Sequence, residues 1–414
     1  MRFLVLSLTL PYPPSNGHKL RNWAVLRALA AEGHQLSLLT FAEPNEFQSD
    51  LAPIREVTSD LEIVPIKPVG LSSGEQILSR ALSLARSSPY AVTRFKSREM
   101  AEKIRRRVES GRHHALLAET PYALINLRSK SDVPLILDNH NIEHKLLERY
   151  QEVECSKLRR AYAGLESWKL KTWELGAWKA ADHTWACSHC DKELIEGSHR
   201  GIRCSVIPNV VDLDSYRPSG DGQPTRILFT GGMDWHPNRD AVEYFATEML
   251  PILRWLRPGV ELVVAGRGPS AAFRQRFSGT RGVEFTGTVA DMRSEIQRAS
   301  VCVVPLRIGS GTRLKILEAA GMAKPVVSTS IGAEGLEFED GKEIVLADEP
   351  EKFARAVATL LADRTLARMI GAAARRKAEA SYSLQSLRSA INNSLQEIAS
   401  AGKFAPERSV NRAA

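Results

Sequence analysis

The sequence has no long hydrophobic run, and nowhere approaches the ~18 consecutive apolar residues that a transmembrane helix needs. Its five cysteines are scattered without the regular spacing of a disulfide framework, which indicates a reducing compartment. No G-x-x-x-x-G-K-[ST] phosphate loop occurs, and residues 11–17 lack the G-x-G-x-x-G pattern of a nicotinamide dehydrogenase. No nucleic-acid reading motif is present either, so we expect no nucleic-acid partner.

What is present is the composition of a globular protein. The chain has 414 residues, 43% of them hydrophobic and 25% charged. Its length favours two domains of ~200 residues each. The net charge of +8 favours anionic partners such as phosphorylated small molecules or an anionic membrane face. Residues 1–10 form too short an apolar run for a signal peptide and lead into Pro-Tyr-Pro-Pro, so we expect a buried first strand there.

Strand-like and helix-like segments alternate along the whole chain, which predicts two successive parallel α/β domains. The clearest helix is expected at about 18–32, where apolar residues recur at helical spacing before Gly33. A turn-rich stretch, 215–224, marks the boundary, so we predict domains at 1–214 and 215–380. We expect the helix within 381–414 to return to the first domain, followed by a polar tail. The predicted strands lie at 3–8, 35–40, 61–66, 115–119, 134–139, 183–188, 204–208, 226–230, 261–265, 283–286, 301–305, 325–329 and 343–346.

The most informative segment is Leu306–Ala319, which follows an expected strand and opens a helix. Its two glycines let the backbone approach a ligand, and the helix start offers free N–H groups to an anion. Arg313 and Lys315 add positive charge, and Glu318 lies one to two turns further along. The segment is suited to a nucleoside diphosphate, with phosphates at the helix start and ribose hydroxyls at Glu318. A glycine-rich turn with solvated charges is the alternative that spacing alone leaves open.

The chain resembles glycosyltransferase family 4. Five segments of the second half are similar to family motifs and follow in the same order: Phe229–Ala241, Val264–Gly268, Phe285–Val289, Gly309–Glu318 and Lys324–Leu336. In the first half, Pro11–Gly17 is similar to the family's opening loop, and Asp138–Glu143 resembles its D-x-H-N-x-E motif. The resemblance covers nearly the whole chain and is closest to bacterial sugar transferases of polysaccharide synthesis.

This resemblance implies the GT-B fold, in which two Rossmann-like domains face each other across a cleft. It implies an acceptor on the first domain, a nucleotide-sugar donor on the second, retention of anomeric configuration, and no metal or other cofactor. It assigns chemistry to His140 beside the transferred sugar, to Arg313 and Lys315 at the diphosphate, and to Glu318 at the ribose. His18 is the candidate acceptor contact. The implied donor-binding residues are Gly17, Gly231, Gly232, Gly266, Gly268, Thr288, Val289, Gly309, Ser310, Gly311, Thr312, Gly335 and Leu336.

The sequence departs from the family pattern at three positions. Many members have an Arg after the first glycine of the second domain and a Lys about six residues later, where this chain has Gly232 and approximately Asn238. Ser310 stands where many carry an additional Glu. We expect Arg313 and Lys315 to supply the missing positive charge.

Three other patterns have ordinary structural interpretations. Cys187 and Cys190 form C-x-x-C without a second pair, and Asp212-Leu213-Asp214 imitates a metal motif; we expect packing and a connector turn instead. The segment 157–185 carries four tryptophans among basic residues. It is a candidate for peripheral contact with an anionic membrane, with core packing of the tryptophans as the alternative.

We therefore predict a cytoplasmic enzyme, peripheral to the inner membrane face if the basic segment binds lipid. It would move a sugar from a nucleotide-diphosphate sugar to a saccharide or lipid-linked acceptor in exopolysaccharide, lipopolysaccharide or cell-envelope glycan synthesis. Two alternatives remain: a non-catalytic sugar-nucleotide-binding protein, and a nucleotide-sugar epimerase or hydrolase of the same fold. Retained nucleotide binding without transfer would distinguish the first of these.

Overall fold

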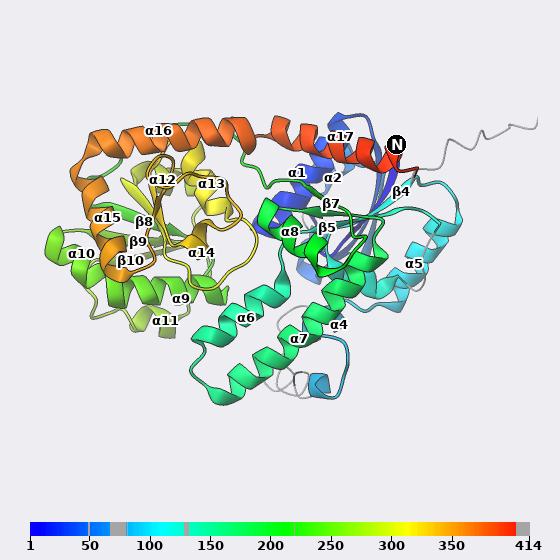
Figure 1. Cartoon of the computed structure of the whole chain (residues 1–414), viewed down its shortest axis with the longest axis horizontal. Coiled ribbons are helices and arrows are strands. Elements are labelled where there is room, and N and C mark those ends of the chain that lie inside the picture. Colours follow the sequence, from blue (N-terminus) through cyan, green and yellow to red (C-terminus); the bar gives the residue numbers. More distant parts are fainter. Residues whose placement is uncertain (49, 67–79, 81, 128–131, 219, 403–414) are drawn as a thin grey trace, which may run out of the picture. The chain divides into compact units, whose positions relative to one another are not determined.

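The computed structural model describes residues 1–48, 50–66, 80, 82–127, 132–218 and 220–402. Within these, the chain divides into two compact units, each built on a fully parallel sheet (Figure 1). Unit 1 comprises residues 1–148, 156–208 and 387–414, and unit 2 comprises 149–155 and 209–386. Unit 2 thus begins before the expected boundary at residue 215. Most of the expected polar tail lies outside the described residues.

Unit 1 contains a seven-stranded sheet in the order β3-β2-β1-β4-β5-β6-β7. Its first strand is buried on both faces, with Phe3, Val5 and Leu6 at most 2% exposed, because helices cover both sides of a parallel sheet. The strands are β1 Arg2–Ser7, β2 Gln35–Ala42, β3 Asp60–Pro65, β4 Ala115–Ala118, β5 Leu135–Asn139, β6 His183–Ala186 and β7 Cys204–Val206.

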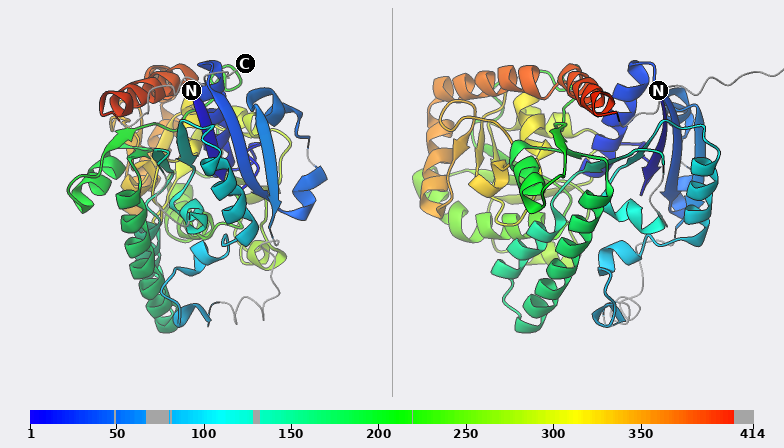
Figure 2. Two further views of the ribbon diagram at one scale, coloured as in Figure 1. Left: turned by 90° about the vertical axis from the view of Figure 1, so that its right-hand side faces the viewer. Right: turned by 45° about the vertical axis from the view of Figure 1, so that its right-hand side comes forward.

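The helices of unit 1 connect these strands, and two of them matter most for the site and surface. α1 begins where the Asn16 side chain accepts a hydrogen bond from the Lys19 N–H, at 3.0 Å, which caps the helix start. α7 is the long green helix of Figures 1 and 2. The helices are α1 Gly17–Ala31, α2 Ala52–Val57, α4 Tyr90–Thr93, α5 Arg98–Glu109, α6 Glu143–Val153, α7 Lys157–Ala180, α8 His189–Ser198 and α17 Leu384–Ser400, with 3-10 turns at Pro44–Gln48 and Pro121–Asn126.

The C-terminal helix α17 packs on unit 1, although it follows unit 2 in the sequence. The indole Nε1 of Trp185 donates to Ser394 Oγ at 2.8 Å, and Ser205 Oγ donates to Glu397 Oε2 at 2.9 Å. Arg388 donates through Nε to Glu32 Oε1 at 2.6 Å. The side chains of Leu387 and Ile391, both on α17, are fully buried, so α17 is part of the first unit's core.

Unit 2 contains a six-stranded sheet in the order β10-β9-β8-β11-β12-β13. The strands are β8 Arg226–Thr230, β9 Glu261–Ala265, β10 Val283–Gly287, β11 Val301–Val304, β12 Val326–Ser328 and β13 Val345–Leu346. Its helices are α9 His236–Tyr244, a π-helical turn Phe245–Met249, α10 Leu250–Leu256, α11 Ala271–Gln275, α12 Met292–Arg298, α13 Leu314–Gly321, α14 Ser330–Ala333, α15 Pro350–Ala362 and α16 Arg364–Ser381.

The strand orders locate the expected binding edges. In unit 1 the order reverses between β1 and β4, and in unit 2 between β8 and β11. Ligands of such sheets bind beyond the carboxyl ends of the strands at this reversal. The thirteen strands predicted from sequence are all present among the described residues, and the predicted doubly parallel α/β architecture is confirmed. No described helix is long and apolar enough to cross a membrane.

Candidate functional site

The carboxyl edge of the unit 2 sheet is built from three glycine turns that hold one another. The Gly231 N–H donates to Ala265 O at 2.9 Å, the Met233 N–H to Arg267 O at 2.7 Å, and the Gly266 N–H to Gly287 O at 3.1 Å. A Cβ at Gly266 would lie 2.2 Å from the Gly231 carbonyl oxygen, and its φ of +149° also disfavours a side chain. Glycine is therefore required for these turns to pack together.

Lys315, in the first turn of α13, is the central cation of this edge. Its Nζ donates to Asn238 Oδ1 at 3.0 Å and lies 3.9 Å from the centre of the Phe229 ring. The Asn238 amide also donates to Gly232 O at 2.9 Å, so one side chain connects the first glycine turn to α13. Burial, followed by the nearby charge of Arg313, lowers the pKa of Lys315 to about 7.

Arg313, the other predicted cation of this segment, hydrogen-bonds its own loop. Its guanidinium donates to the carbonyl oxygens of Ser310 and Gly311, the latter at 2.7 Å, and so braces its own loop. Thr312 in the same loop accepts a hydrogen bond from the Asn209 amide at 2.5 Å. The loop that precedes α13 is thus held in shape by side chains on both sides. Both predicted cations are half-buried, and Lys315 is the one that contacts Asn238 and the Phe229 ring.

Glu318 lies one turn beyond Lys315 on α13 and is half-buried. Its Oε1 accepts a hydrogen bond from the Tyr216 hydroxyl at 3.0 Å, and burial raises its pKa to about 6. Burial likewise raises the pKa of Tyr216. A carboxylate held by one neutral donor can still accept hydrogen bonds from ribose hydroxyls.

Of the remaining predicted donor residues, Gly17 begins α1 in unit 1, and the others lie in loops of unit 2. Thr288 is exposed and Val289 half-buried, directly after β10. Gly335 has a φ of +78°, and the Leu336 N–H donates to Ala333 O at 3.1 Å in the turn after α14. Gly268 and Gly309 complete the set at the ends of β9 and β11.

The carboxyl edge of the unit 1 sheet holds a chain of polar side chains. His140 follows β5, and its Nδ1 lies 3.0 Å from His18 Nδ1 near the start of α1. His140 Nε2 lies 3.2 Å from Asp138 Oδ2, and the Asn22 amide lies 3.2 Å from His18 Nε2. The Asp138 carboxylate accepts a hydrogen bond from the Nε2–H of His140, so Nδ1 of the neutral His140 ring carries no proton. His140 Nδ1 therefore accepts a hydrogen bond from the Nδ1–H of His18. His18 Nε2 then accepts from Asn22.

Burial disfavours the charged form of both histidines. Burial, followed by the charge of His140, lowers the pKa of His18 to about 3, and burial lowers the pKa of His140. Burial opposes ionisation of Asp138, but Arg21 and His140 hold its pKa at about 2. The Arg21 guanidinium donates hydrogen bonds to that carboxylate, with its Nε 3.1 and 3.0 Å from the two oxygens. The predicted His140 and His18 are therefore brought together.

Four residues of this hydrogen-bonded group at the unit 1 edge were not predicted to belong to a site: Arg21, Asn22, Glu119 and Asp138. Asn22 donates to Glu119, whose pKa burial raises well above its ordinary value. Asp138 belongs to the motif that includes His140, so its spacing of two residues was the available signal. Arg21 lies four residues after Gly17, and only the fold shows that this turn of α1 reaches the end of β5.

Two patterns have the structural roles expected for them. Cys187 is buried and its thiol lies 3.3 Å from His140 O, while Cys190 is exposed. Burial raises the pKa of the Cys187 thiol to about 12, which disfavours the reactive thiolate. Asp212 accepts from the N–H groups of Asp214 and Ser215 and shapes a turn. Among the described residues, no group of three or more His, Cys, Asp or Glu is placed to hold a metal ion.

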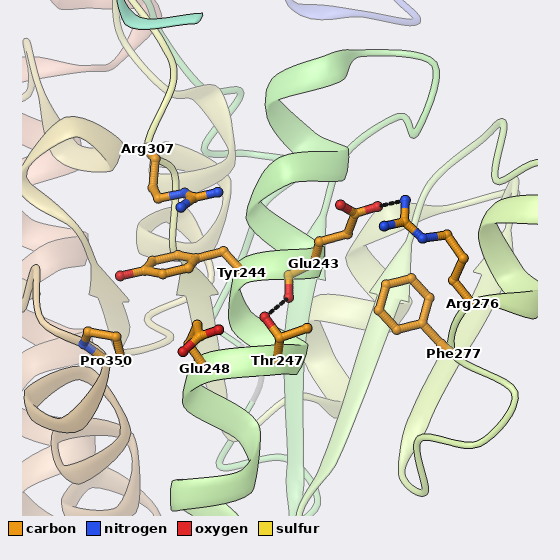
Figure 3. A pocket seen from close by; sticks show the side chains of 8 residues that line it. All are labelled: Glu243, Tyr244, Thr247, Glu248, Arg276, Phe277, Arg307 and Pro350. Atoms are coloured by element: carbon orange, nitrogen blue, oxygen red, sulfur yellow. Dashed lines mark hydrogen bonds and ion pairs between the residues drawn. The ribbon is translucent and has the colours of Figure 1, made fainter. Parts of the chain in front are cut away.

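A separate hollow of about 410 Å³ lies on unit 2 beside the π-helical turn (Figure 3). Arg307 stacks over the Tyr244 ring at 4.3 Å and pairs with Asp240. Arg276 pairs with Glu243, as Figure 3 also shows. None of the residues that line this hollow was predicted from sequence to belong to a site. The lining residues are Glu243, Tyr244, Thr247, Glu248, Arg276, Phe277, Arg307 and Pro350.

Two family models match this chain. The first, Glycosyltransferase Family 4, matches residues 16–215, and the second, Glycosyl transferases group 1, matches residues 224–363. Together they cover most of the chain, which belongs to the family 4 and group 1 glycosyltransferases. The two parallel-sheet units are accordingly those of the GT-B fold.

One relative and two solved structures show how widely the likeness extends. An uncharacterized 44.6 kDa protein in the cps region of Klebsiella pneumoniae is 22% identical over 370 residues, 86% of this chain and 89% of that protein. Sucrose-phosphate synthase from Thermosynechococcus elongatus has a TM-score of 0.73 at 16% identity, over 97% of this chain and 100% of that one. Anabaena HepE in complex with UDP-glucose has a TM-score of 0.64 at 15% identity, over 96% and 100%. These structural likenesses establish the fold.

Proposed function

We propose that this glycosyltransferase moves a sugar, with retention of its anomeric configuration and without a metal, from a nucleotide-diphosphate sugar to a saccharide or lipid-linked acceptor. The observation that carries the proposal is the arrangement on α13. A half-buried lysine, opposed glycine turns and a carboxylate one helical turn further follow the β8–β11 strand reversal of unit 2. HepE, which has the same fold, is known in complex with UDP-glucose. That complex supports a donor of the same chemical class here.

Each part of the arrangement suits one part of such a donor. Lys315 and the amides of Gly232 and Gly311 would hold the diphosphate, because they place positive charge and N–H donors at one edge. Glu318 would accept hydrogen bonds from the ribose hydroxyls. Backbone groups at Thr288 and Val289 would contact the base. Arg313 would hold the loop in the shape that the phosphates need, and would add its charge to the same region.

The chemistry follows from charge development at the broken bond. Cleavage of a glycosyl–phosphate bond leaves positive charge on the sugar and negative charge on the departing diphosphate. Lys315 would stabilise the leaving group, since a cation fixed in a buried position needs little reorganisation. With retention, the acceptor hydroxyl attacks the face from which the diphosphate departs, and a phosphate oxygen takes its proton. No enzyme nucleophile takes part in this scheme.

We assign His140 and His18 to sugar hydroxyls rather than to proton abstraction. Both are neutral, and the chain from Asp138 through His140 to His18 fixes their tautomers. A ring in a fixed tautomer positions a hydroxyl well but is a weak base when its pKa is lowered. Both rings are already hydrogen-bonded to protein groups. To contact a sugar hydroxyl, one ring would give up one of these hydrogen bonds and form one to the substrate instead.

The relative in the cps region of Klebsiella pneumoniae supports a role in polysaccharide synthesis. The five cysteines, none of them in a disulfide, support action in the cytoplasm. The net charge of the chain and its nucleotide-type site fit a phosphorylated substrate rather than a nucleic acid. No second function is favoured by a specific feature of the structure.

The test is a screen of the purified protein against UDP-, GDP-, ADP- and dTDP-sugars, first without metal and then with EDTA. We expect slow release of one nucleotide diphosphate, unchanged by EDTA, and an anomer of the product that matches the donor. Loss of activity in EDTA would contradict metal independence. Tight binding without release, even with lipid-phosphate and saccharide acceptors present, would show a non-catalytic nucleotide-binding protein. Absence of binding to every donor would refute the assignment of α13.

A further inference from the structure

Helix α7 of unit 1 exposes one face that the transfer reaction does not use. Three tryptophans of the segment point into unit 1: Trp178 and Trp185 are at most 2% exposed, and Trp173 Nε1 donates to Pro121 O at 3.0 Å. Trp168 is 64% exposed. Core packing therefore explains three of the four tryptophans, and Trp168 stands apart from them on the exposed face.

The charge on this face is of one sign. The two acidic residues of α7, Glu166 and Glu174, are 5% and 0% exposed. Glu166 pairs with Lys169 at 3.1 Å, and Glu174 accepts from the Glu143 N–H at 2.8 Å. The exposed charged residues of the helix are all basic: Lys157, Arg159, Arg160, Lys171 and Lys179.

The geometry of the helix aligns the basic residues with the tryptophan. Lys157, Trp168 and Lys179 are spaced eleven residues apart, close to three turns, so they lie along one line of the helix. Lys171 follows Trp168 at i+3, on the neighbouring position of the same face. The indole is thus flanked by ammonium groups in both directions, on the helix that Figures 1 and 2 show in green.

A second apolar element is fastened to the same helix. Ser83 lies between Leu82 and Leu84, which are 50% and 55% exposed. Its carbonyl accepts from Lys169 Nζ at 2.6 Å, and its hydroxyl lies 3.1 Å from the Tyr162 hydroxyl. Leu158, one turn before Tyr162, is 85% exposed. Of the eight exposed large hydrophobic side chains among the described residues, four therefore belong to α7 or to the segment bonded to it.

We propose that this surface, formed by α7 and residues 82–84, binds an anionic lipid bilayer. Basic side chains would meet the headgroup phosphates, while Trp168 and the leucines enter the boundary with the acyl chains. Charge complementarity favours an anionic partner, because α7 has no exposed acidic residue that would repel an anionic surface. A nucleic acid would use the basic residues but leave Leu82, Leu84 and Leu158 without a partner. The inference is independent of the transfer reaction, since vesicle binding requires no donor.

The experiment is co-sedimentation of the full-length protein with vesicles of phosphatidylcholine alone or with phosphatidylglycerol added. We expect binding to the anionic vesicles that weakens as salt is raised, and little binding to the neutral ones. Lys171→Glu combined with Lys179→Glu should weaken it at least about tenfold, and Trp168→Ala about fivefold or more. Each variant should keep the wild-type circular dichroism spectrum and UDP affinity.

The matched control is Trp255→Ala, which removes a tryptophan that is 79% exposed on α10 of unit 2. We expect this variant to bind anionic vesicles like the wild type. Equal losses for Trp168→Ala and Trp255→Ala would overturn the proposal, as would equal binding to neutral and anionic vesicles. Tighter binding to a duplex oligonucleotide than to anionic vesicles, unchanged by Trp168→Ala, would show a nucleic-acid surface instead.

Discussion

The ammonium group of Lys315 lies 3.0 Å from the side-chain oxygen of Asn238, on a different element of unit 2. Many members of the family carry a lysine at about the position of Asn238, where this chain has an amide. The same Asn238 holds the Gly232 carbonyl at 2.9 Å. Lys315 of α13 thus places a positive charge beside the α9 position at which other members carry a lysine. Asn238 hydrogen-bonds both this lysine and the glycine turn.

Lys315 should make donor binding depend on pH. Its pKa in the free protein is about 7 because of burial, and a bound diphosphate would raise it. A group whose pKa rises on binding contributes fully below its free-state pKa, and the contribution is lost as pH rises through the bound-state pKa. We therefore expect the contribution of Lys315 to UDP affinity to be constant below about pH 7 and to be lost at higher pH, so that the affinity falls above pH 7. Calorimetry in buffers of different ionisation enthalpy should show proton uptake at pH 8.

Lys315→Gln should remove both the pH dependence and about tenfold or more of the UDP affinity at pH 6. Lys342→Gln, at an exposed lysine of the same unit, is the matched control and should change neither. A Lys315→Gln variant that keeps the wild-type pH profile would show that another group titrates.

Asn238 should act through Lys315 as a positioning residue. Asn238→Asp places a carboxylate beside the ammonium group, which should raise the pKa of Lys315 and move the fall in UDP affinity to higher pH. Asp240→Asn, two residues along the same helix, leaves Lys315 untouched and should keep the wild-type profile. An unshifted profile in Asn238→Asp would contradict the coupling, whatever the overall loss of affinity.

Glu318 should contact the ribose. Glu318→Ala should weaken UDP binding by about 10- to 100-fold, the range of hydrogen bonds to a charged group. The sharper measurement compares UDP with 2′-deoxy-UDP by calorimetry. The wild type should discriminate between them, and Glu318→Ala should not, if the lost partner is a ribose hydroxyl. Tyr216→Phe removes only the protein donor to Glu318 and should keep the discrimination.

His140→Ala should lower turnover far more than nucleotide affinity, because the histidine is assigned to the sugar and not to the nucleotide. His183→Ala is a control, since His183 lies on β6 and bonds Ser205 at 2.7 Å, away from the chain of Asp138, His140 and His18. Steady-state kinetics and UDP titration separate the two effects. Equal losses of turnover and UDP affinity in His140→Ala would contradict the assignment of this histidine to the transferred sugar.

Arg21 and Asp138 should contribute strongly to stability. Both side chains are at most 2% exposed, and Arg21→Met leaves a buried carboxylate without its partner, which costs about 3–5 kcal/mol. The pKa of Asp138 is held at about 2, below its ordinary value of 3.8, so the stabilisation is present above pH 4 and is lost as pH falls toward 2. Urea unfolding should therefore show the largest difference between variant and wild type near pH 7. Arg276→Met, at an exposed pair, should cost at most about 1 kcal/mol.

The sequence was sufficient for the strands and for the class of fold. Buried parallel strands are continuous apolar runs bounded by glycine and polar residues, so Phe3–Leu6 and Glu261–Ala265 can be recognised without a structure. The continuity of helices was not predicted from sequence. The helical segment that follows β8 is divided into α9, a π-helical turn and α10. Pro251 follows Leu250 there, and a proline lacks the N–H that a continuous helix would need.

The sequence by itself also determined which residue types are available at the two sheet edges, because the motifs follow the strands directly. Only the tertiary structure decided which of them meet. Arg313 and Lys315 are two residues apart, yet one bonds its own loop and the other lies over the Phe229 ring, since residues at this spacing point in different directions from the helix start. Likewise, His18 and His140 are 122 residues apart and meet because β1 and β5 both flank β4. Contacts set by the order of strands in a sheet are not encoded by spacing along the chain.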